Sequence, residues 1–211
     1  VCSLNDLKDN YSKKKNVSGD ENVLLQDYIE GIDFNVLTKF KDNSYEIIAS
    51  WDEIIGIEEN KHIKAVGLYS PSKVFDDNNL IKKIKEILDK FNNLLTFERY
   101  IVAFSFRVDN NGNIFLIEIH IDFLGDSIAE KLLPHSSTKF DFFEIVINFL
   151  LKKESIEMIK FDRSLLIYEN DKLYGNQQLS ESIVLLEKEK QNSNLIELSY
   201  LEYLKNCKEL L

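Results

Sequence analysis

The sequence predicts an α+β fold, in which an antiparallel sheet is flanked by helices, and three patterns support this prediction. Two apolar stretches, 99–108 and 113–121, flank the turn-forming sequence DNNG, which is typical of a β-hairpin. A second hairpin is predicted over 34–51, where two apolar stretches are separated by KDNS. The stretch 77–92 instead repeats its apolar residues at the spacing of an amphipathic helix. Hairpins that alternate with helices are typical of α+β or mixed α/β domains.

Length and composition are those of a globular protein. The 211 residues are enough for one domain, or for one large and one small domain, and 44% of them are hydrophobic. The net charge of −10 argues against a nucleic-acid partner, because phosphate binding needs basic patches. The sequence has no apolar run of the roughly 20 residues that a membrane span needs. It also opens without a signal-peptide pattern.

The cysteines and the first residue suggest where the protein works and how much of it is present. Cys2 and Cys207 lie at opposite ends of the chain without metal-binding spacing, which is typical of free thiols in a reducing compartment. A cytoplasmic protein is therefore expected. Because the chain begins with Val1 and not with Met, it is expected to be a fragment or a processed form.

The remaining elements follow from caps, breakers and apolar runs. A helix is expected to begin at Ser3 or Asn5, and the helix expected over 139–153 would be capped by one of the residues 136–138. A terminal helix is expected over 195–211. Short strands are expected over 23–29, 159–169 and 172–175, and a short helix over 126–133. A short run over 62–69 lies between loops, and 179–190 precedes the terminal helix.

An acid and a histidine stand in the apolar stretch 113–121, which would otherwise suit the middle of a sheet. Side chains alternate along a strand, so Glu118 and His120 are predicted to point the same way. A carboxylate that becomes buried must be paired, hydrogen-bonded or bound to a metal. The face is therefore either a solvated polar surface or a ligand site. Ile114 and Leu116 are expected on that face too, which would place the acid at the end of an apolar stripe.

The length of the loop in DNNG decides which residues of the preceding strand face this pair. A loop of two or four residues places Ser105 and Arg107 on the Glu118 face, whereas a loop of three residues places Phe104 and Phe106 there. The first arrangement is favoured because it pairs polar residues with polar residues.

Other polar residues carry weaker signals. Asp33 follows a turn, where an acid usually caps or is solvated. His62 and His135 are isolated, so hydrogen-bonded or solvated histidines are expected. The sequence lacks G-x-S-x-G, a Walker loop and G-x-G-x-x-G, which argues against a serine hydrolase of the α/β class and against two common nucleotide-binding motifs.

The order of several segments is more specific than any one of them. VLLQDYIEGIDFNV, FSFRVDNNGNIFLIEIH, GDSIAEKLL and KFDFFEIVINFLL, in that order, resemble the C-terminal half of an ATP-grasp domain. The similarity is to carboxylate–amine ligases of the carbamoyl-phosphate-synthase-like and amino-acid-ligase-like groups, and it covers Leu4 to Leu151. It implies three parts: a remnant of the lid subdomain (1–25), the C-terminal ATP-grasp subdomain (26–152) and a small α+β subdomain (153–211).

The resemblance implies an ATP-dependent carboxylate–amine or carboxylate–thiol ligase that forms an acyl phosphate. ATP with Mg²⁺ or Mn²⁺ would be the cofactors, and small carboxylates and amines the substrates. It assigns no catalytic side chain. The residues that it assigns to ATP binding are Gln26, Asp27, Tyr28 and Ile29 at the adenine, Asp33 at the ribose and Lys64 at a phosphate. The residues that it assigns to the metal are Glu118 and His120.

The departures from this family bear on activity. Ser105 stands where the family usually has a second acid, His120 where it has Asn, and Asp122 where it has a phosphate-binding Arg. Replacing Asp122 by Arg is therefore expected to strengthen ATP binding. The strands that would cover the triphosphate precede this half, so a homodimer or a missing N-terminal half would have to complete the site. The alternatives are a degenerate ATP-grasp domain that binds nucleotides or proteins, and an unrelated α+β interaction domain.

Overall fold

The computed structural model divides the chain into two compact units, 1–30 and 31–211. In the first unit, residues 11–13 are helical, and residues 26–30 are in neither a helix nor a strand. The strand predicted over 23–29 is therefore wrong for its described part. The residues that the structure describes are 5, 8, 11–13, 26–59, 63–94, 99–121, 124–125, 127–152, 159–169, 171–175, 182–198 and 200.

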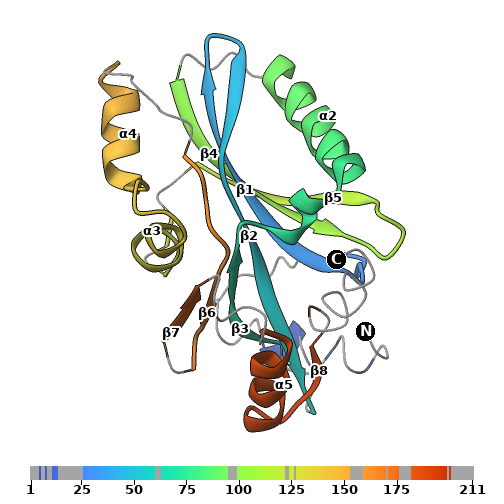
Figure 1. The fold of residues 1–211 in the computed structure, drawn as a ribbon. Coiled ribbons are helices and arrows are strands. Elements are labelled where there is room, and N and C mark those ends of the chain that lie inside the picture. Colours follow the sequence, from blue (N-terminus) through green and yellow to red (C-terminus); the bar gives the residue numbers. More distant parts are fainter. Residues whose placement is uncertain are drawn as a thin grey trace. The chain divides into compact units, whose positions relative to one another are not determined.

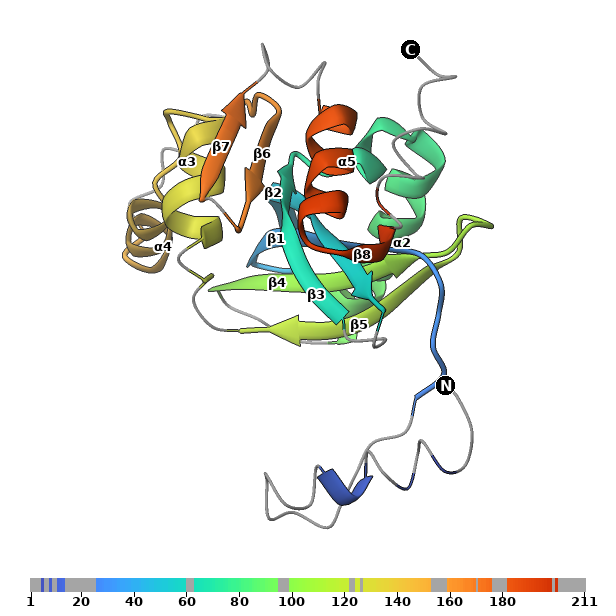
Figure 2. The ribbon, with the colours of Figure 1, turned by 90° about the horizontal axis from the view of Figure 1, so that it is seen from below.

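The second unit is built on an eight-stranded sheet whose described strand pairs are all antiparallel (Figures 1 and 2). The strand order is β5-β4-β1-β2-β3-β6-β7, and β8 pairs with β2 beside this path. This confirms the predicted α+β class. The strands are β1 (Ile32–Lys41), β2 (Ser44–Glu58), β3 (Ile63–Ser70), β4 (Arg99–Val108), β5 (Ile114–His120), β6 (Ser164–Ile167), β7 (Lys172–Gly175) and β8 (Leu195–Leu198).

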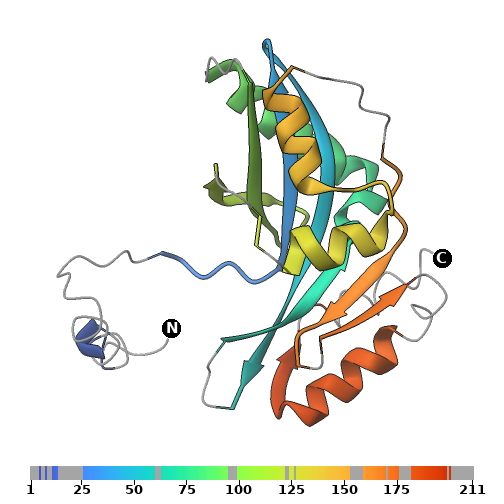
Figure 3. The same ribbon diagram turned by 90° about the vertical axis from the view of Figure 1, so that its left-hand side faces the viewer.

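Helices cover both faces of the sheet (Figures 1 and 3). One face packs against α2, whose buried residues are Ile84 and Leu88, and against the segment of α5 and β8. The opposite face packs against η2, α3 and α4. The helices are η1 (Lys73–Asp76), α2 (Asn78–Leu94), the π-helical turn η2 (Ser127–Leu132), α3 (Leu133–Ser136), α4 (Phe142–Leu150) and α5 (Ser182–Asn192).

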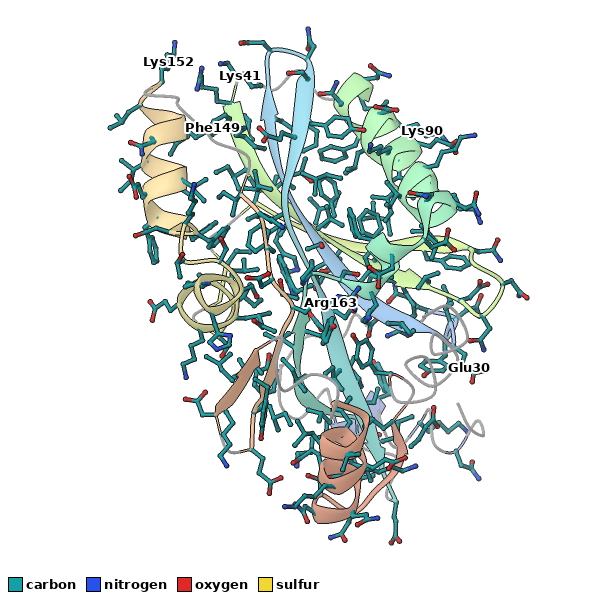
Figure 4. All side chains as sticks on the ribbon, viewed as in Figure 1. Glu30, Lys41, Lys90, Phe149, Lys152 and Arg163 are labelled. Carbon is teal, nitrogen blue, oxygen red and sulfur yellow. The ribbon has the colours of Figure 1, made fainter. Side chains whose placement is uncertain are left out.

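Two distinct cores result. The core on the α2 face is rich in aromatic rings: Phe104 stacks on Phe106 and meets Phe91 edge to face. The core on the α4 face contains Trp51, and Phe149 also lies buried between α4 and the sheet (Figure 4). The carbonyl of Phe149 accepts a hydrogen bond from the Arg99 guanidinium at 2.7 Å, which ties the end of α4 to β4.

The two predicted hairpins form, and each has the backbone that its turn residues favour. Asp42 and Asn43 have φ values of 49° and 61°, which matches the two-residue turn that suits the twist of paired strands. Gly112 has φ of 72°, a conformation that glycine adopts without a steric penalty.

The N-cap of α4 differs from the prediction. Asp141 caps the helix by accepting a hydrogen bond from the Glu144 amide at 2.9 Å, and residues 136–138 do not. The hydroxyl of Ser136 instead donates to the Leu132 carbonyl inside the preceding helix. The sequence D-x-x-E at 141–144 is itself a capping signal, which the apolar run around it obscured.

The terminal helix expected from 195 is wrong for its first residues. Leu195–Leu198 form β8, which pairs with Gly56–Glu58 of β2. The β2 strand is 15 residues long and outlasts β1, whose pairing with β2 ends at Glu53, so its far end offers an open edge. Tyr200 is helical, and 201–211 lie outside the described residues.

Candidate functional site

Polar side chains gather on the sheet face that carries the α3–α4 core, at the end of the strands beyond that core. Asp33 pairs with Glu53 on one side and with Arg107 on the other, and Asn35 pairs with Ser105. Further along the same strands the pattern turns apolar, with Leu37 on β1, Trp51 on β2 and Ala103 on β4. One face of the sheet therefore has a polar end and an apolar end.

A β-bulge brings Glu118 to this polar end. The hairpin loop has three residues, because the Asp109 amide donates to the Asn113 carbonyl. A regular ladder from that loop would place Glu118 opposite Phe104. The register shifts by one residue after Leu116, so that Glu118 lies opposite Ser105. The prediction that Ser105 lies on the face of Glu118 is confirmed, but the favoured loop of two or four residues is wrong, because the loop has three residues and the bulge produces this arrangement.

The same bulge corrects the predicted apolar stripe. Ile114 pairs with Val108 and Leu116 with Phe106, and both of these partners belong to the core on the α2 face. Glu118 therefore shares its face with neither Ile114 nor Leu116. The acid belongs to a polar surface and does not end an apolar stripe.

A hydrogen-bonded relay crosses three strands behind Glu118. The Ser105 hydroxyl donates to Asn35 Oδ1 at 2.6 Å, and Asn35 Nδ2 donates to Glu53 Oε1 at 3.0 Å. Because a carboxylate only accepts, Glu53 orients the Asn35 amide, and Asn35 in turn orients the Ser105 proton. Asn35 is buried, so this orientation is held within the sheet.

The electrostatics of Glu53 show how closely the acids are placed. Burial raises the pKa of the Glu53 carboxyl above its usual value, and the Asn35 hydrogen bond lowers it in part. The charges of Asp33 and Glu118 raise the pKa further, whereas His120 lowers it. Glu53 therefore belongs to the same electrostatic cluster as Glu118 and His120.

Two of the acids that the sequence singled out have basic partners. His120 Nε2 lies 2.8 Å from Glu118 Oε1, and both side chains are well exposed. Asp33 binds Arg107 through two short hydrogen bonds of 2.6 Å, one from Nε and one from Nη2. Such a two-point contact fixes both side chains at once. The structure thus brings Asp33, Glu118 and His120 to one surface.

Lys64 lies elsewhere. It pairs with Gly56 on β2, and a Cβ added to Gly56 would collide with the side chain of Leu195 on β8. Its ammonium donates to the Ser193 hydroxyl at 3.1 Å, on the side of the sheet that α5 and β8 cover. The structure therefore does not bring Lys64 to the polar cluster. An open cleft of about 510 Å³ near Ser193 is lined by Glu58, Glu59, Ser193 and Asn194.

The other residues that the resemblance assigns to ATP binding belong to the unit 1–30. Gln26, Asp27 and Tyr28 are exposed there, and Ile29 is partly buried. Asp122 and His62 lie outside the described residues. His135 Nδ1 contacts the Ser164 hydroxyl at 2.9 Å, as expected for a hydrogen-bonded histidine.

The described side chains do not fit a resident metal ion as they stand. Across the described part of the chain, no three His, Cys, Asp or Glu side chains converge into a set that could hold one. Glu118 already contacts His120, and Glu53 Oε1 already accepts from Asn35. A hard cation such as Mg²⁺ needs several oxygen ligands at once.

Sequence reasoning missed Asn35 and Glu53. Each stands in an apolar strand, and their proximity to Ser105 follows only from the order of β2, β1 and β4 in the sheet. One signal was available: Asp52 and Glu53 interrupt the apolar run ASWDEIIGI, much as Glu118 and His120 interrupt theirs.

The comparison with protein families identifies this fold. The model of the ATP-grasp domain matches residues 3–130, which is well over half of the chain. The chain therefore belongs to the ATP-grasp family, as its ordered segments predicted. No curated protein sequence matches it at a significant level.

Solved structures share the fold at low sequence identity. An L-amino acid ligase from Bacillus licheniformis has a TM-score of 0.60 at 13% identity, over 78% of this chain and 42% of that one. A Campylobacter jejuni biotin carboxylase in complex with β-γ-ATP has a TM-score of 0.55 at 18% identity, over 77% and 36%. A biotin carboxylase domain dimer from Hydrogenobacter thermophilus, with MgADP, ADP and bicarbonate, has a TM-score of 0.54 at 15% identity, over 77% and 35%. This chain thus spans less than half the length of these structures. None of the described helices has the length and apolar character needed to cross a membrane.

Proposed function

We propose that this chain forms part of an ATP-dependent ligase that joins a carboxylate to an amine or a thiol. A carboxylate oxygen would attack the γ-phosphorus of ATP, and the bond from that phosphorus to the β–γ bridging oxygen would break. ADP would leave, and an acyl phosphate would remain. The amine or thiol would then attack the acyl carbon, lose its proton and displace inorganic phosphate. Membership of the ATP-grasp family supports this reaction class.

The single observation that carries the proposal is the position of Glu118. It lies opposite Ser105 on a partly exposed sheet face, with Asn35 and Glu53 fixed behind it. In such a reaction the protein mainly positions reactants and balances charge. The Ser105–Asn35–Glu53 relay and the Asp33–Arg107 pair would hold the side chains of this sheet face in place, and Glu118 would face the nucleotide.

A second candidate function is a degenerate ATP-grasp domain that binds a nucleotide or a protein without catalysis. The contact between His120 and Glu118 favours it, because the imidazole already engages one of the two carboxylate oxygens that could bind a metal ion. Asp33 is similarly committed to Arg107 through both oxygens. In this case the polar surface would be a fixed ion-pair network.

Trapping of the acyl phosphate separates the two candidates. The protein would be incubated with ATP, Mg²⁺ or Mn²⁺, hydroxylamine and a panel of small carboxylic acids. A ligase would produce hydroxamates and ADP in equal amounts, and Glu118→Gln would abolish both. A matched control is Glu130→Gln, which changes an exposed acid on η2 outside the cluster. Nucleotide binding without hydroxamate for any acid would support the second candidate.

A further inference from the structure

The β5 strand is an open edge of the sheet. It stands at one end of the strand order, and within the described chain it pairs with β4 alone. Its apolar side chains are unusually accessible for such residues. The exposed fractions are 41% for Leu116, 48% for Ile117, 37% for Ile119 and 59% for the adjoining Ile121.

An apolar edge of this kind invites another strand. Its outward backbone N–H and C=O groups form a template for pairing, and proteins usually protect such edges with lysine, proline, a β-bulge or a covering segment. The bulge of β5 lies at Ile117, and the ladder is regular from Glu118 to His120, which leaves this part of the edge able to pair. The β5 sequence IFLIEIH contains neither lysine nor proline. Its only titratable side chains, Glu118 and His120, both point to the polar face.

We propose that β5 pairs in an antiparallel manner with β5 of a second copy of this chain, with Ile119 at the twofold axis. In this register Glu118 of each copy lies opposite His120 of the partner subunit, so an acid meets a base on both sides of the axis. A register centred on Glu118 would instead place two glutamates opposite each other. Like charges directly opposite destabilise a strand pair, whereas opposite charges stabilise it. Charge complementarity therefore selects both the partner and the register.

The apolar residues agree with this register. Ile119 would lie opposite its own counterpart, so two β-branched side chains would pack across the new strand pair. The sheet would continue through both copies, and its polar face would stay open. His120 of the partner subunit would adjoin Glu118, so each copy would contribute a residue to the other's polar cluster. This inference does not depend on the proposed ligase activity.

A competing apolar surface exists on α4, and it serves as a control. Its outward stripe consists of Phe143, Ile147, Leu150 and Leu151, with exposed fractions between 47% and 58%. This stripe has no acid–base pattern that would make it complementary to a second copy. The proposal therefore predicts that substitutions on α4 leave the dimer intact.

Sedimentation equilibrium of the full chain tests the interface, with circular dichroism to show that each variant is folded. The wild-type chain is expected to dimerise, and Ile119→Lys to raise the dimer Kd about tenfold or more. Ile63→Lys is the matched control, because Ile63 is 59% exposed on the internal strand β3. It and Ile147→Lys are expected to leave Kd unchanged. A wild-type chain that stays monomeric up to roughly 100 μM would overturn the proposal. So would a dimer that Ile147→Lys dissociates and Ile119→Lys does not.

A charge exchange tests the register. Glu118→Lys alone would place a lysine opposite His120 of the partner subunit, and it is expected to raise Kd. Combining it with His120→Glu restores an opposite-charge pair in the same register and is expected to return Kd toward the wild-type value. If the double variant dimerises as weakly as Glu118→Lys alone, the register centred on Ile119 is wrong.

Discussion

Ser105 and Glu118 lie directly opposite each other on neighbouring strands because β5 contains an extra residue between Leu116 and Glu118. The three-residue loop sets the register of the first rungs, and the bulge at Ile117 then shifts it by one. A single inserted residue thus decides whether the acid faces a polar relay or the aromatic core.

Deleting Ile117 is expected to leave this arrangement in place. Removal of the extra residue makes the ladder regular, and Glu118 still follows Leu116 opposite Ser105. Because Ile117 is half exposed, we expect Tm to fall by no more than about 5 °C. Nuclear Overhauser contacts between His120 and its partner Ala103 should persist. Deletion of Ile119 is the matched control, since it would move His120 to the opposite face. Loss of the His120–Ala103 contacts in the Ile117 deletion would contradict the assignment of the bulge.

The relay predicts different costs for two substitutions that look equally conservative. Asn35→Leu leaves the Ser105 hydroxyl and Glu53 without their common partner, which should lower the free energy of unfolding by about 1–3 kcal/mol. Glu53→Gln keeps an acceptor for Asn35 and removes a charge that burial disfavours, so its cost should stay below about 0.5 kcal/mol. Urea denaturation measures both. Equal costs would mean that the charge of Glu53 matters and the relay does not.

We expect His120→Asn to make nucleotide binding depend on Mg²⁺, because the contact between His120 and Glu118 hinders metal binding in the wild-type protein. The substitution removes the imidazole from Glu118 Oε1 and leaves the carboxylate to a cation. We expect the affinity for ADP in the presence of Mg²⁺ to rise about tenfold, measured by calorimetry with and without Mg²⁺. His135→Asn is the control, because its ring contacts Ser164 outside the cluster. An unchanged Mg²⁺ dependence would show that His120 does not block the site.

Asp52 is a buried acid on the other face of β2. Its Oδ2 accepts hydrogen bonds from the Lys73 amide at 2.9 Å and from the Tyr200 hydroxyl at 2.8 Å. Burial raises its pKa to about 6, although hydrogen bonds from Ser72, Lys73 and Tyr200 oppose the shift. Asp52 thus joins the residues after β3 to Tyr200, and its contribution to the free energy of unfolding depends on pH.

The sign of that dependence follows from linkage. The pKa of Asp52 in the folded state lies above its unfolded value. The contribution of Asp52 to the free energy of unfolding is therefore complete below about pH 4 and is lost as the pH rises through about 6. Between pH 4 and pH 7 the wild-type chain should lose roughly 3 kcal/mol of unfolding free energy relative to Asp52→Asn, which cannot ionise. Denaturation of both proteins across this range measures the difference. A constant difference would show that Asp52 does not titrate near pH 6.

Much of the fold was predictable because local signals agreed with the tertiary structure. The helix over 77–92 has one apolar face and packs with it, and the hairpins carry residues that tolerate positive φ. The segment 195–198 was not predictable from its own residues. Its leucines suit a helix or a strand, and the strand forms because β2 extends past β1 and offers an edge.

The candidate site was predictable only along single strands. Alternation placed Glu118 and His120 on one face, and polar pairing selected Ser105 as the neighbour of Glu118. Asn35 and Glu53 escaped notice because they come from strands whose neighbours are set by the whole sheet. The bulge escaped notice as well, since no glycine marks it in NIFLIEIH.

The most direct test of the account is titration calorimetry of ATP into this chain, with and without Mg²⁺ or Mn²⁺. We expect saturable ATP binding with Kd below roughly 1 mM, which the metal changes little in the wild-type chain and strengthens in His120→Asn. Failure to bind ATP with either metal, while the protein remains folded, would contradict a nucleotide site on this surface.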